Sequence, residues 1–209
     1  MKSSVLPDPA SIDNGEMRKR IRRAAFQAFT KHGYAGTSTL QIATRAKVSK
    51  RDLYALFASK QTMLVDCIKT RSAKMQLPPG LPVCRSRKML ASTLVAFATT
   101  LLMETSHPAV IAMFRLAISE ADRSPEVAQA LEESRIANRR TLTDLLAHAQ
   151  SVGLLPSGDA AEMASQFLAL LCGELMLSLL LGVAARRSRA QIERHAAEVT
   201  NAFLRLHPQ

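Results

Sequence analysis

The stretch TSTLQIATRAKVSKRDLYALFASK, residues 37–60, decides the fold of this chain. It predicts two short helices separated by a tight turn, because Ser38 and Gln41 can form a capping box at the start of the first helix. Ser49 and Asp52 repeat this arrangement for the second helix, with Asp in place of Glu or Gln. The second helix and its flanks carry Lys, Arg and Tyr. This layout is typical of a helix-turn-helix that reads DNA.

One further helix on each side completes a small unit around this stretch. Before it, apolar residues recur every three or four positions from Asn14 to His32, and Gly33 ends the pattern. After it, Ser59 can cap a helix over residues 60–75, which the segment QLPPGLP at residues 76–82 terminates.

Positive charge is concentrated in the same third of the chain. The net charge is +11 over 209 residues, and residues 1–74 contain fifteen Lys and Arg against five Asp and Glu. Residues 75–209 contain thirteen against twelve. Such confinement indicates a polyanionic partner, because phosphate contacts by Lys and Arg dominate nucleic-acid binding. A membrane surface is the competing polyanion.

The outward face of the second helix supplies the candidate DNA contacts. Leu53, Leu56 and Phe57 are expected to point into the small core, which leaves a basic face opposite them. We expect Arg51 to contact guanine, and Ala55 a thymine methyl group. The full set of candidate DNA-binding residues is Thr39, Gln41, Lys50, Arg51, Tyr54, Ala55 and Lys60, with Thr39 and Lys60 as anchors to the DNA backbone. The alternative is an ordinary helical bundle with a solvated basic face.

These residues resemble the DNA-binding domain of the TetR family of transcriptional regulators. The matching positions are Ile21, Ala24, Ala25, Phe29, Gly33, Tyr34, Thr37, Ile42, Ala43, Val48, Ser49, Lys50, Leu53, Tyr54, Phe57, Ser59 and Lys60. The resemblance implies a homodimeric repressor whose recognition helices sit in successive major grooves of a palindromic operator. It also implies a larger helical domain that binds an inducer.

Two positions depart from the pattern of that family. Lys47 stands at the turn where Gly is usual, and a positive φ there would cost about 1 kcal/mol relative to Gly. Ala55 and Leu56 stand where many relatives carry an aromatic residue or His, so the operator sequence cannot be taken from those relatives.

The remaining chain is predicted to be helical over residues 85–105, 108–122, 125–152, 159–185 and 189–206, with Ser124 and Pro125 as a helix-start pair. The chain is therefore all-α, with about nine helices. We expect a flexible basic and polar arm at residues 1–15, a helix-turn-helix DNA-binding domain at 16–75, and a helical ligand-binding and dimerisation domain at 76–209. Residues 114–185 resemble the C-terminal domain of the AefR-like branch of the same family.

Apolar stripes of the larger domain are candidate walls of a ligand pocket, because Met and Thr suit an adaptable cavity. The candidate ligand-binding residues are Met89, Thr93, Phe97, Thr100, Met103, Met113, Phe114, Arg135, Asn138, Leu142, Cys172 and Met176. Arg135 and Asn138 interrupt an apolar stripe and would orient a polar group of the ligand. The alternative is that the Met and Phe side chains are core packing, while Arg135 reaches water.

The last two helices are expected to form the dimer interface, because a two-fold dimer suits a palindromic site. The candidate dimerisation residues are Leu168, Leu171, Leu175, Leu179, Ile192, Ala196, Val199 and Phe203. The apolar run 167–185 also has the length of a membrane span, but Glu174 near its middle would cost roughly 2.5 to 3.5 kcal/mol there. A basic membrane-associated helical protein is thus the alternative to a DNA-binding regulator.

Other classes of site find little support in the sequence. Cys67, Cys84 and Cys172 are widely spaced and suit neither a disulfide framework nor a zinc site. His107 and His148 lack a second ligand at metal spacing and are expected to be capping or core groups. No nucleotide-binding or hydrolase motif occurs, so we expect neither an enzyme nor a cofactor. The N-terminus lacks a signal peptide's apolar region, which favours a cytoplasmic regulator.

Overall fold

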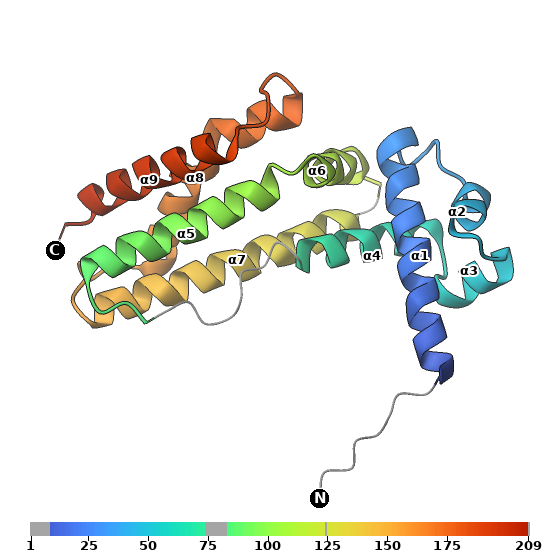
Figure 1. The fold of residues 1–209 in the computed structure, drawn as a ribbon, viewed down its shortest axis with the longest axis horizontal. Coiled ribbons are helices and arrows are strands. Elements are labelled where there is room, and N and C mark those ends of the chain that lie inside the picture. Colours follow the sequence, from blue (N-terminus) through green and yellow to red (C-terminus); the bar gives the residue numbers. More distant parts are fainter. Residues whose placement is uncertain (1–8, 74–82, 124, 209) are drawn as a thin grey trace, which may run out of the picture. The chain divides into compact units, whose positions relative to one another are not determined.

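The computed structural model describes residues 9–73, 83–123 and 125–208. Within these ranges the chain forms nine helices and no strand, which confirms the all-α prediction (Figure 1). The helices are α1 Pro9–His32, α2 Thr39–Ala46, α3 Lys50–Leu56, α4 Lys60–Ala73, α5 Arg87–Thr105, α6 Pro108–Glu120, α7 Pro125–Ser151, α8 Ala160–Leu181 and α9 Arg189–Leu206.

Three boundaries bear on the sequence predictions. Helix α1 begins at Pro9 rather than near Asn14, so the last residues of the predicted arm are helical. Helix α8 ends at Leu181, where Gly182 adopts a left-handed conformation with φ of 75° and closes the helix. The remainder of the arm (1–8), the predicted break (76–82) and the proposed helix-start residue Ser124 lie outside the described residues.

The contacts divide the chain into two compact units. The first unit comprises the chain up to Thr70 together with Leu116–Ala130, and the second comprises Arg71–Arg115 together with Leu131–Gln209. Helices α6 and α7 therefore contribute residues to both units. The predicted division at residues 75 and 76 had placed both helices wholly in the second domain.

The helix-turn-helix in the first unit begins with the predicted caps. The Ser38 hydroxyl accepts a hydrogen bond from the Gln41 amide at 3.2 Å, and the Gln41 side chain accepts one from the Ser38 amide at 2.7 Å. The Ser49 hydroxyl accepts a bond from the Asp52 amide at 3.0 Å at the start of α3. Beneath these helices Ile42 and Leu53 are fully buried. The short helices α2 and α3 thus gain their stability from caps and from one shared core.

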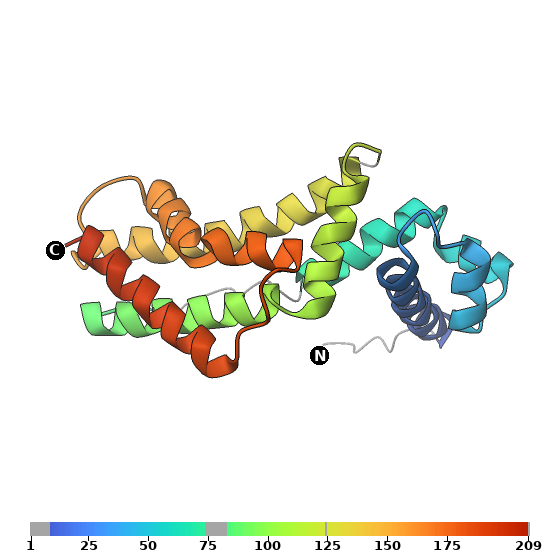
Figure 2. The ribbon, with the colours of Figure 1, turned by 90° about the horizontal axis from the view of Figure 1, so that it is seen from above.

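The centre of the second unit is a series of phenylalanine rings. Phe167 of α8 lies 6.3 Å from Phe97 of α5 and 5.2 Å from Phe203 of α9, both in edge-to-face geometry. Helix α9 packs along α5, which Figure 2 shows from above. Because each ring buries a large apolar area, this cluster contributes strongly to the stability of the unit.

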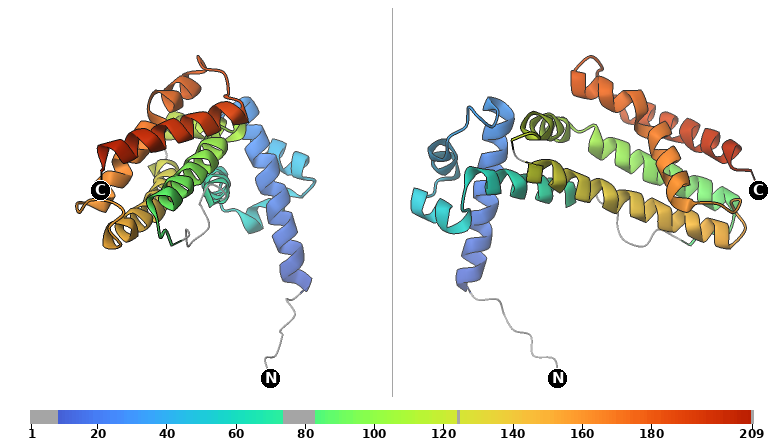
Figure 3. Two further views of the ribbon diagram at one scale, coloured as in Figure 1. Left: turned by 60° about the vertical axis from the view of Figure 1, so that its left-hand side comes forward. Right: turned by 180° about the vertical axis from the view of Figure 1, so that it is seen from behind.

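A kink divides α8 at Gly173, whose φ of 16° and ψ of −125° are not helical. The bend is visible in Figure 3, where α8 is orange. Nε2 of His195 lies 3.1 Å from the Leu171 carbonyl oxygen, so α9 provides a polar contact just before the kink.

One arginine joins three distant segments of the second unit. The guanidinium of Arg87, at the start of α5, donates to the Leu154 carbonyl at 2.7 Å. It also donates to the carbonyls of Leu204 and His207 at the end of α9, at 2.6 and 2.7 Å. These carbonyls lie where helical bonding ends, and Arg87 supplies their missing donors.

Candidate nucleic-acid interface

Helix α3 turns the predicted reading face outward. Lys50, Arg51, Tyr54 and Ala55 are all exposed, while Leu53 on the opposite side is fully buried. Within the described part of the chain, the side chains of Lys50 and Arg51 make no hydrogen bond or ion pair. Two unpaired cations, a phenol and a methyl group on one helical face can contact phosphates and the edges of bases.

The hydroxyl groups of Thr39 and Tyr54 connect the two helices across this face. They lie 3.1 Å apart, although the residues are on α2 and α3. The ring of Tyr54 is 48 % exposed, so its position is fixed at the hydroxyl while its face stays open. The structure thereby brings two of the predicted contact residues together.

Gln41 has a structural task within the same region. Its side-chain oxygen accepts the Ser38 amide hydrogen bond of the capping box, while the residue as a whole is exposed. The side-chain amide nitrogen is therefore the group that Gln41 can offer to DNA.

Lys60 differs from the simple backbone anchor that the sequence predicts. Its Nζ donates to the carbonyls of Tyr34 at 2.8 Å and Thr37 at 3.0 Å, and it lies 4.2 Å from the centre of the Tyr34 ring. Burial, with smaller contributions from Glu120 and Glu126, raises the pKa of Tyr34, so the ring beneath the ammonium stays neutral. Two of the three Lys60 donors thus hold the segment before α2, and one remains for a phosphate.

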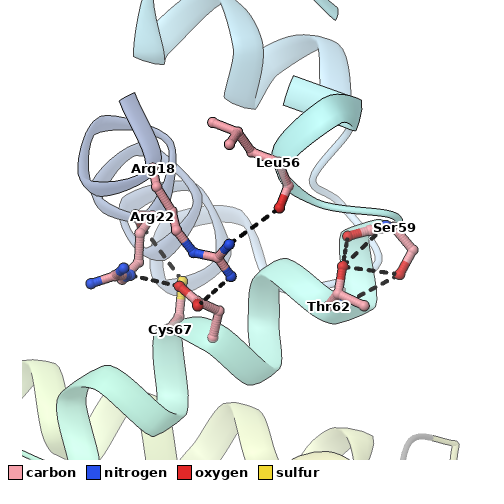
Figure 4. Close-up of polar contacts among 7 residues, drawn as sticks. Arg18, Arg22, Leu56, Ser59, Thr62 and Cys67 are labelled. Atoms are coloured by element: carbon pink, nitrogen blue, oxygen red, sulfur yellow. Dashed lines mark hydrogen bonds and ion pairs between the residues drawn. The ribbon is translucent and has the colours of Figure 1, made fainter. Parts of the chain in front are cut away.

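Two arginines of α1 bind Asp66 of α4, a contact that the sequence analysis missed. Arg18 and Arg22 approach the two carboxylate oxygens at 2.9 and 2.6 Å, and Arg18 also donates to the Leu56 carbonyl at 3.4 Å (Figure 4). The Arg18 guanidinium lies 4.5 Å from the centre of the Phe57 ring. These cations therefore hold α1 and α4 around the end of α3.

Cys67 lies beside this ion-pair cluster, and Ser59 directly precedes the same helix, as Figure 4 shows. Burial raises the pKa of the Cys67 thiol to about 12, so the group is protonated and unreactive at neutral pH. The Ser59 hydroxyl accepts the Thr62 amide hydrogen bond at 3.1 Å, which confirms the predicted cap of α4.

The predicted ligand-binding residues do not share one environment. Thr93, Phe97, Met113, Asn138 and Leu142 are buried, and Met103, Phe114, Cys172 and Met176 are half-buried. Met89, Thr100 and Arg135 are exposed, and Arg135 forms an ion pair with Glu132 at 3.0 Å. These three side chains therefore do not face the interior of the second unit, and their contact with a ligand stays a prediction.

Among these candidates, Asn138 of α7 carries an unsatisfied polar atom. Its side chain is 6 % exposed, and its Oδ1 has no hydrogen-bond partner. A buried amide oxygen without a donor is costly, so this position can accept a hydrogen bond from a bound molecule. Phe97, by contrast, belongs to the aromatic core with Phe167.

The predicted dimerisation residues are mostly part of the core of a single chain. Leu171, Leu179, Ile192, Ala196, Val199 and Phe203 are buried, and Leu168 and Leu175 are half-buried against the same core. Within the single chain the six buried residues are covered by its own helices, and their place in a dimer interface stays a prediction. Their stripe is the most apolar face of each helix, and the chain covers it with its own α5. The exposed apolar side chains of α8 are instead Leu170, Leu177 and Leu181.

Helix α8 is also long and apolar enough to cross a membrane by length and composition. One side of the helix lies in the protein core, where Phe167 and Leu171 are fully buried. This side accounts for only part of the apolar composition of α8, because 22% of its most apolar stretch is buried.

The imidazole of His107 caps the start of α6, as expected for a lone histidine. Its Nδ1 accepts the Ala109 amide hydrogen bond at 3.2 Å and lies 3.0 Å from Nη2 of Arg71. Burial first, then Arg71 and Arg186, lower the pKa of His107, whereas Glu104 acts in the opposite direction. The neutral imidazole is the form that this contact requires.

Two protein-family patterns match this sequence, one near its N-terminus and one over its larger C-terminal part. The pattern of the "Bacterial regulatory proteins, tetR family" matches residues 21–67, which contain the helix-turn-helix. The pattern of the "AefR-like transcriptional repressor, C-terminal domain" matches residues 92–207.

Individual relatives agree with these matches over most of the chain. The flavonoid-responsive regulator FrrA is 32% identical, with 92% of this chain and 97% of that chain covered and a TM-score of 0.75. A TetR transcriptional regulator from Agrobacterium tumefaciens is 25% identical over 93% of this chain and 95% of that chain, with a TM-score of 0.81. The uncharacterized HTH-type transcriptional regulator YvkB of Bacillus subtilis (strain 168) is 27% identical over 78% of this chain and 84% of its own length.

Proposed function

We propose, because the chain belongs to the TetR family of transcriptional regulators, that it is a ligand-responsive repressor that binds a palindromic operator as a homodimer. The observation that carries this proposal is the outward face of α3, where Lys50, Arg51, Tyr54 and Ala55 are exposed above a buried Leu53. A small apolar or amphipathic inducer would release the operator, and the protein would act in the cytoplasm.

The face of α3 suggests a role for each of its side chains. Arg51 would make a bidentate contact to guanine, and Ala55 would touch a thymine methyl group. Lys50 and Tyr54 would reach a base edge or a phosphate, while Thr39 and the remaining donor of Lys60 would contact the DNA backbone. Loss of Arg51 should therefore relax base preference at one position, by about 1–3 kcal/mol.

The dimer would form through the exposed apolar side of α8. Leu170, Leu177 and Leu181 are 43%, 58% and 68% exposed, and such large apolar groups on one helix support a subunit interface. Glu174 is also exposed on this helix, so it would need a polar partner across the interface. A two-fold axis would then present two α3 helices to half-sites one helical turn apart, or a multiple of it.

The inducer would be a molecule with apolar rings or chains and at least one hydroxyl or amine group. Asn138 supports the polar requirement, because its buried Oδ1 has no donor. The relative FrrA is described as flavonoid-responsive, and flavonoids have this combination of aromatic rings and hydroxyl groups. We therefore propose hydroxylated aromatic compounds as the first class to test.

Release would follow from differential affinity alone. An inducer that prefers a conformation with another spacing of the two α3 helices lowers operator affinity. A coupling of about 1–3 kcal/mol corresponds to roughly 5- to 150-fold weaker binding, and the operator must weaken inducer binding by the same factor.

Two experiments test the proposal. In the first, the protein is titrated with its own upstream DNA and separately with anionic liposomes; retention on liposomes alone would favour the membrane-associated alternative. In the second, a panel of flavonoids is titrated calorimetrically with and without the operator. Equal affinities in the two titrations would contradict the release scheme. The variant Asn138→Leu should weaken a hydroxylated flavonoid more than its deoxy analogue.

A further inference from the structure

We propose that Arg20, a residue of α1 outside the helix-turn-helix, is a positioning residue that sets the orientation of α3 by holding the turn between α2 and α3. The proposal rests on the DNA-binding function proposed above. It concerns a different property, namely how the reading face is kept in place.

The guanidinium of Arg20 bonds to the last carbonyl of α2 and to the carbonyl of the turn residue Lys47. Its Nε and Nη2 donate to the Ala46 carbonyl at 3.2 and 2.8 Å, and Nη2 also donates to the Lys47 carbonyl at 2.8 Å. Carbonyls at a helix C-terminus lack intrahelical partners and form the negative end of the helix dipole. The planar fork of an arginine presents its N–H donors in a fixed geometry, so one side chain can hold both oxygens in a defined arrangement.

The backbone bonds of the turn show why these two carbonyls need an outside donor. The Lys47 amide donates to Thr44 and the Val48 amide donates to Ala43, at 3.2 and 3.1 Å. These bonds satisfy earlier carbonyls of α2 but leave those of Ala46 and Lys47 to Arg20. A side chain 26 positions away in the sequence therefore completes the hydrogen bonding of the turn.

The turn depends on this support because its conformation is unfavourable for the residue that occupies it. Lys47 has φ of 54° and ψ of 50°, and it is the one residue other than glycine with positive φ in the described part of the chain. A left-handed conformation is strained for a side chain with a Cβ. Arg20 binds the carbonyl that precedes Lys47 and the carbonyl of Lys47 itself. It therefore favours the strained left-handed geometry over extended alternatives.

Other cations hold the helix-turn-helix in the same way at its two ends. Lys60 bonds to carbonyls of the segment before α2, and Arg18 bonds to the Leu56 carbonyl at the end of α3. Arg20 holds the turn that lies between these two ends. Because the turn sets the angle between α2 and α3, its relaxation would move the face that carries Arg51 and Tyr54.

The test compares Arg20→Ala with Arg23→Ala, which removes an exposed charge from the same helix. The probe is the duplex that the wild-type protein selects most strongly from a random pool, together with a scrambled duplex. Affinities are measured over a range of salt concentrations. We expect Arg20→Ala to lose about tenfold in affinity for the selected duplex, the equivalent of one charge-assisted hydrogen bond. Binding to the scrambled duplex and the salt slope should match those of Arg23→Ala.

Two outcomes would overturn the proposal. If both duplexes weaken equally and the salt slope falls by about one unit more than in the control, Arg20 is a phosphate contact. If Arg20→Ala and Arg23→Ala are indistinguishable, the Arg20 contacts have no effect on the reading face. The variant Arg20→Lys should recover little of the loss, since a single ammonium does not reproduce the fork.

Hydrogen exchange at the turn gives a readout that does not need DNA. The Val48 amide should exchange faster in Arg20→Ala than in the wild type, and this difference should shrink when Lys47→Gly removes the strain. An unchanged exchange rate would also overturn the proposal. If the wild type selects no duplex, the proposed repressor function fails, while the exchange measurement still decides whether Arg20 holds the turn.

Discussion

In the first unit, three cationic side chains bond to main-chain carbonyls around two short helices, whereas in the second unit phenylalanine rings fill the centre of four long helices. Lys60, Arg20 and Arg18 bond to main-chain carbonyls before α2, at the turn and at the end of α3, so they hold the two short helices in place. Apolar packing around Phe167 is less directional, because a core tolerates different apolar side chains of suitable size and shape. The position of the reading face therefore depends on individual polar contacts as well as on the buried side of α3, while the core of the second unit depends on total buried apolar area.

The largest expected effect comes from placing a charge on the core face of α8 rather than on its exposed face. Leu171 is fully buried, so Leu171→Asp places a carboxylate in the core and should unfold the second unit, at a cost above about 4 kcal/mol. Leu177 is 58% exposed, so Leu177→Asp should leave the fold intact and convert dimers to monomers. Circular dichroism and light scattering measure both effects. A folded, monomeric Leu171→Asp protein would instead place Leu171 in the dimer interface.

The next prediction measures how much the aromatic cluster contributes. Phe203→Ala should lower the free energy of unfolding by about 3–5 kcal/mol, because it leaves a cavity beside Phe167. The matched control is Leu206→Ala on the same helix, where the side chain is 65% exposed and the change should stay within about 0.5 kcal/mol. Urea denaturation measures both variants. Equal losses would mean that packing is no more important than surface contacts in this unit.

A smaller effect is expected from the ion pairs of the first unit. Asp66→Asn removes the shared partner of Arg18 and Arg22 and should cost about 1.5–3 kcal/mol, since both guanidiniums lose a charged acceptor. Glu193→Gln breaks the exposed pair with Arg189 in α9 and should cost no more than about 0.5 kcal/mol. Thermal melts at low and high salt distinguish the pairs. A loss from Glu193→Gln as large as that from Asp66→Asn would remove the proposed contrast between the units.

The smallest effect concerns a single backbone conformation. Lys47→Gly should stabilise the protein by about 1 kcal/mol, because glycine adopts the left-handed region without strain. The melting temperature measures it, and an unchanged or lowered value would show that the Lys47 side chain compensates for its own strain.

The local features of the helix-turn-helix could be predicted from the sequence because they depend on neighbouring residues. The caps at Ser38 and Ser49 and the positive φ of Lys47 involve residues at most a few positions apart, and the structure confirms all three. The exposed face of α3 followed from helical spacing alone. Arg20 and Lys60 were different, because their carbonyl partners lie more than 20 positions away and no periodic pattern indicates them.

The larger domain shows the corresponding limit for apolar stripes. The spacing of Ile192, Ala196 and Phe203 correctly indicated a buried face of α9, but it did not show which surface covers that face. The apolar spacing in the sequence is the same whether α5 of the same chain or a second subunit covers the stripe. The exposed position of Arg135 agrees with the alternative that its side chain reaches water, since a charged residue within a stripe can leave the interior by pairing with Glu132.

The contacts of Arg87 have a consequence for the order in which the nascent chain folds. Its guanidinium lacks the carbonyls of Leu204 and His207, and α5 lacks the packing of α9, until the segment that forms α9 has been synthesised. Until then the apolar interior of the second unit is exposed to water on the ribosome-bound chain. Aggregation of this unit and its binding by chaperones are most favoured during that period.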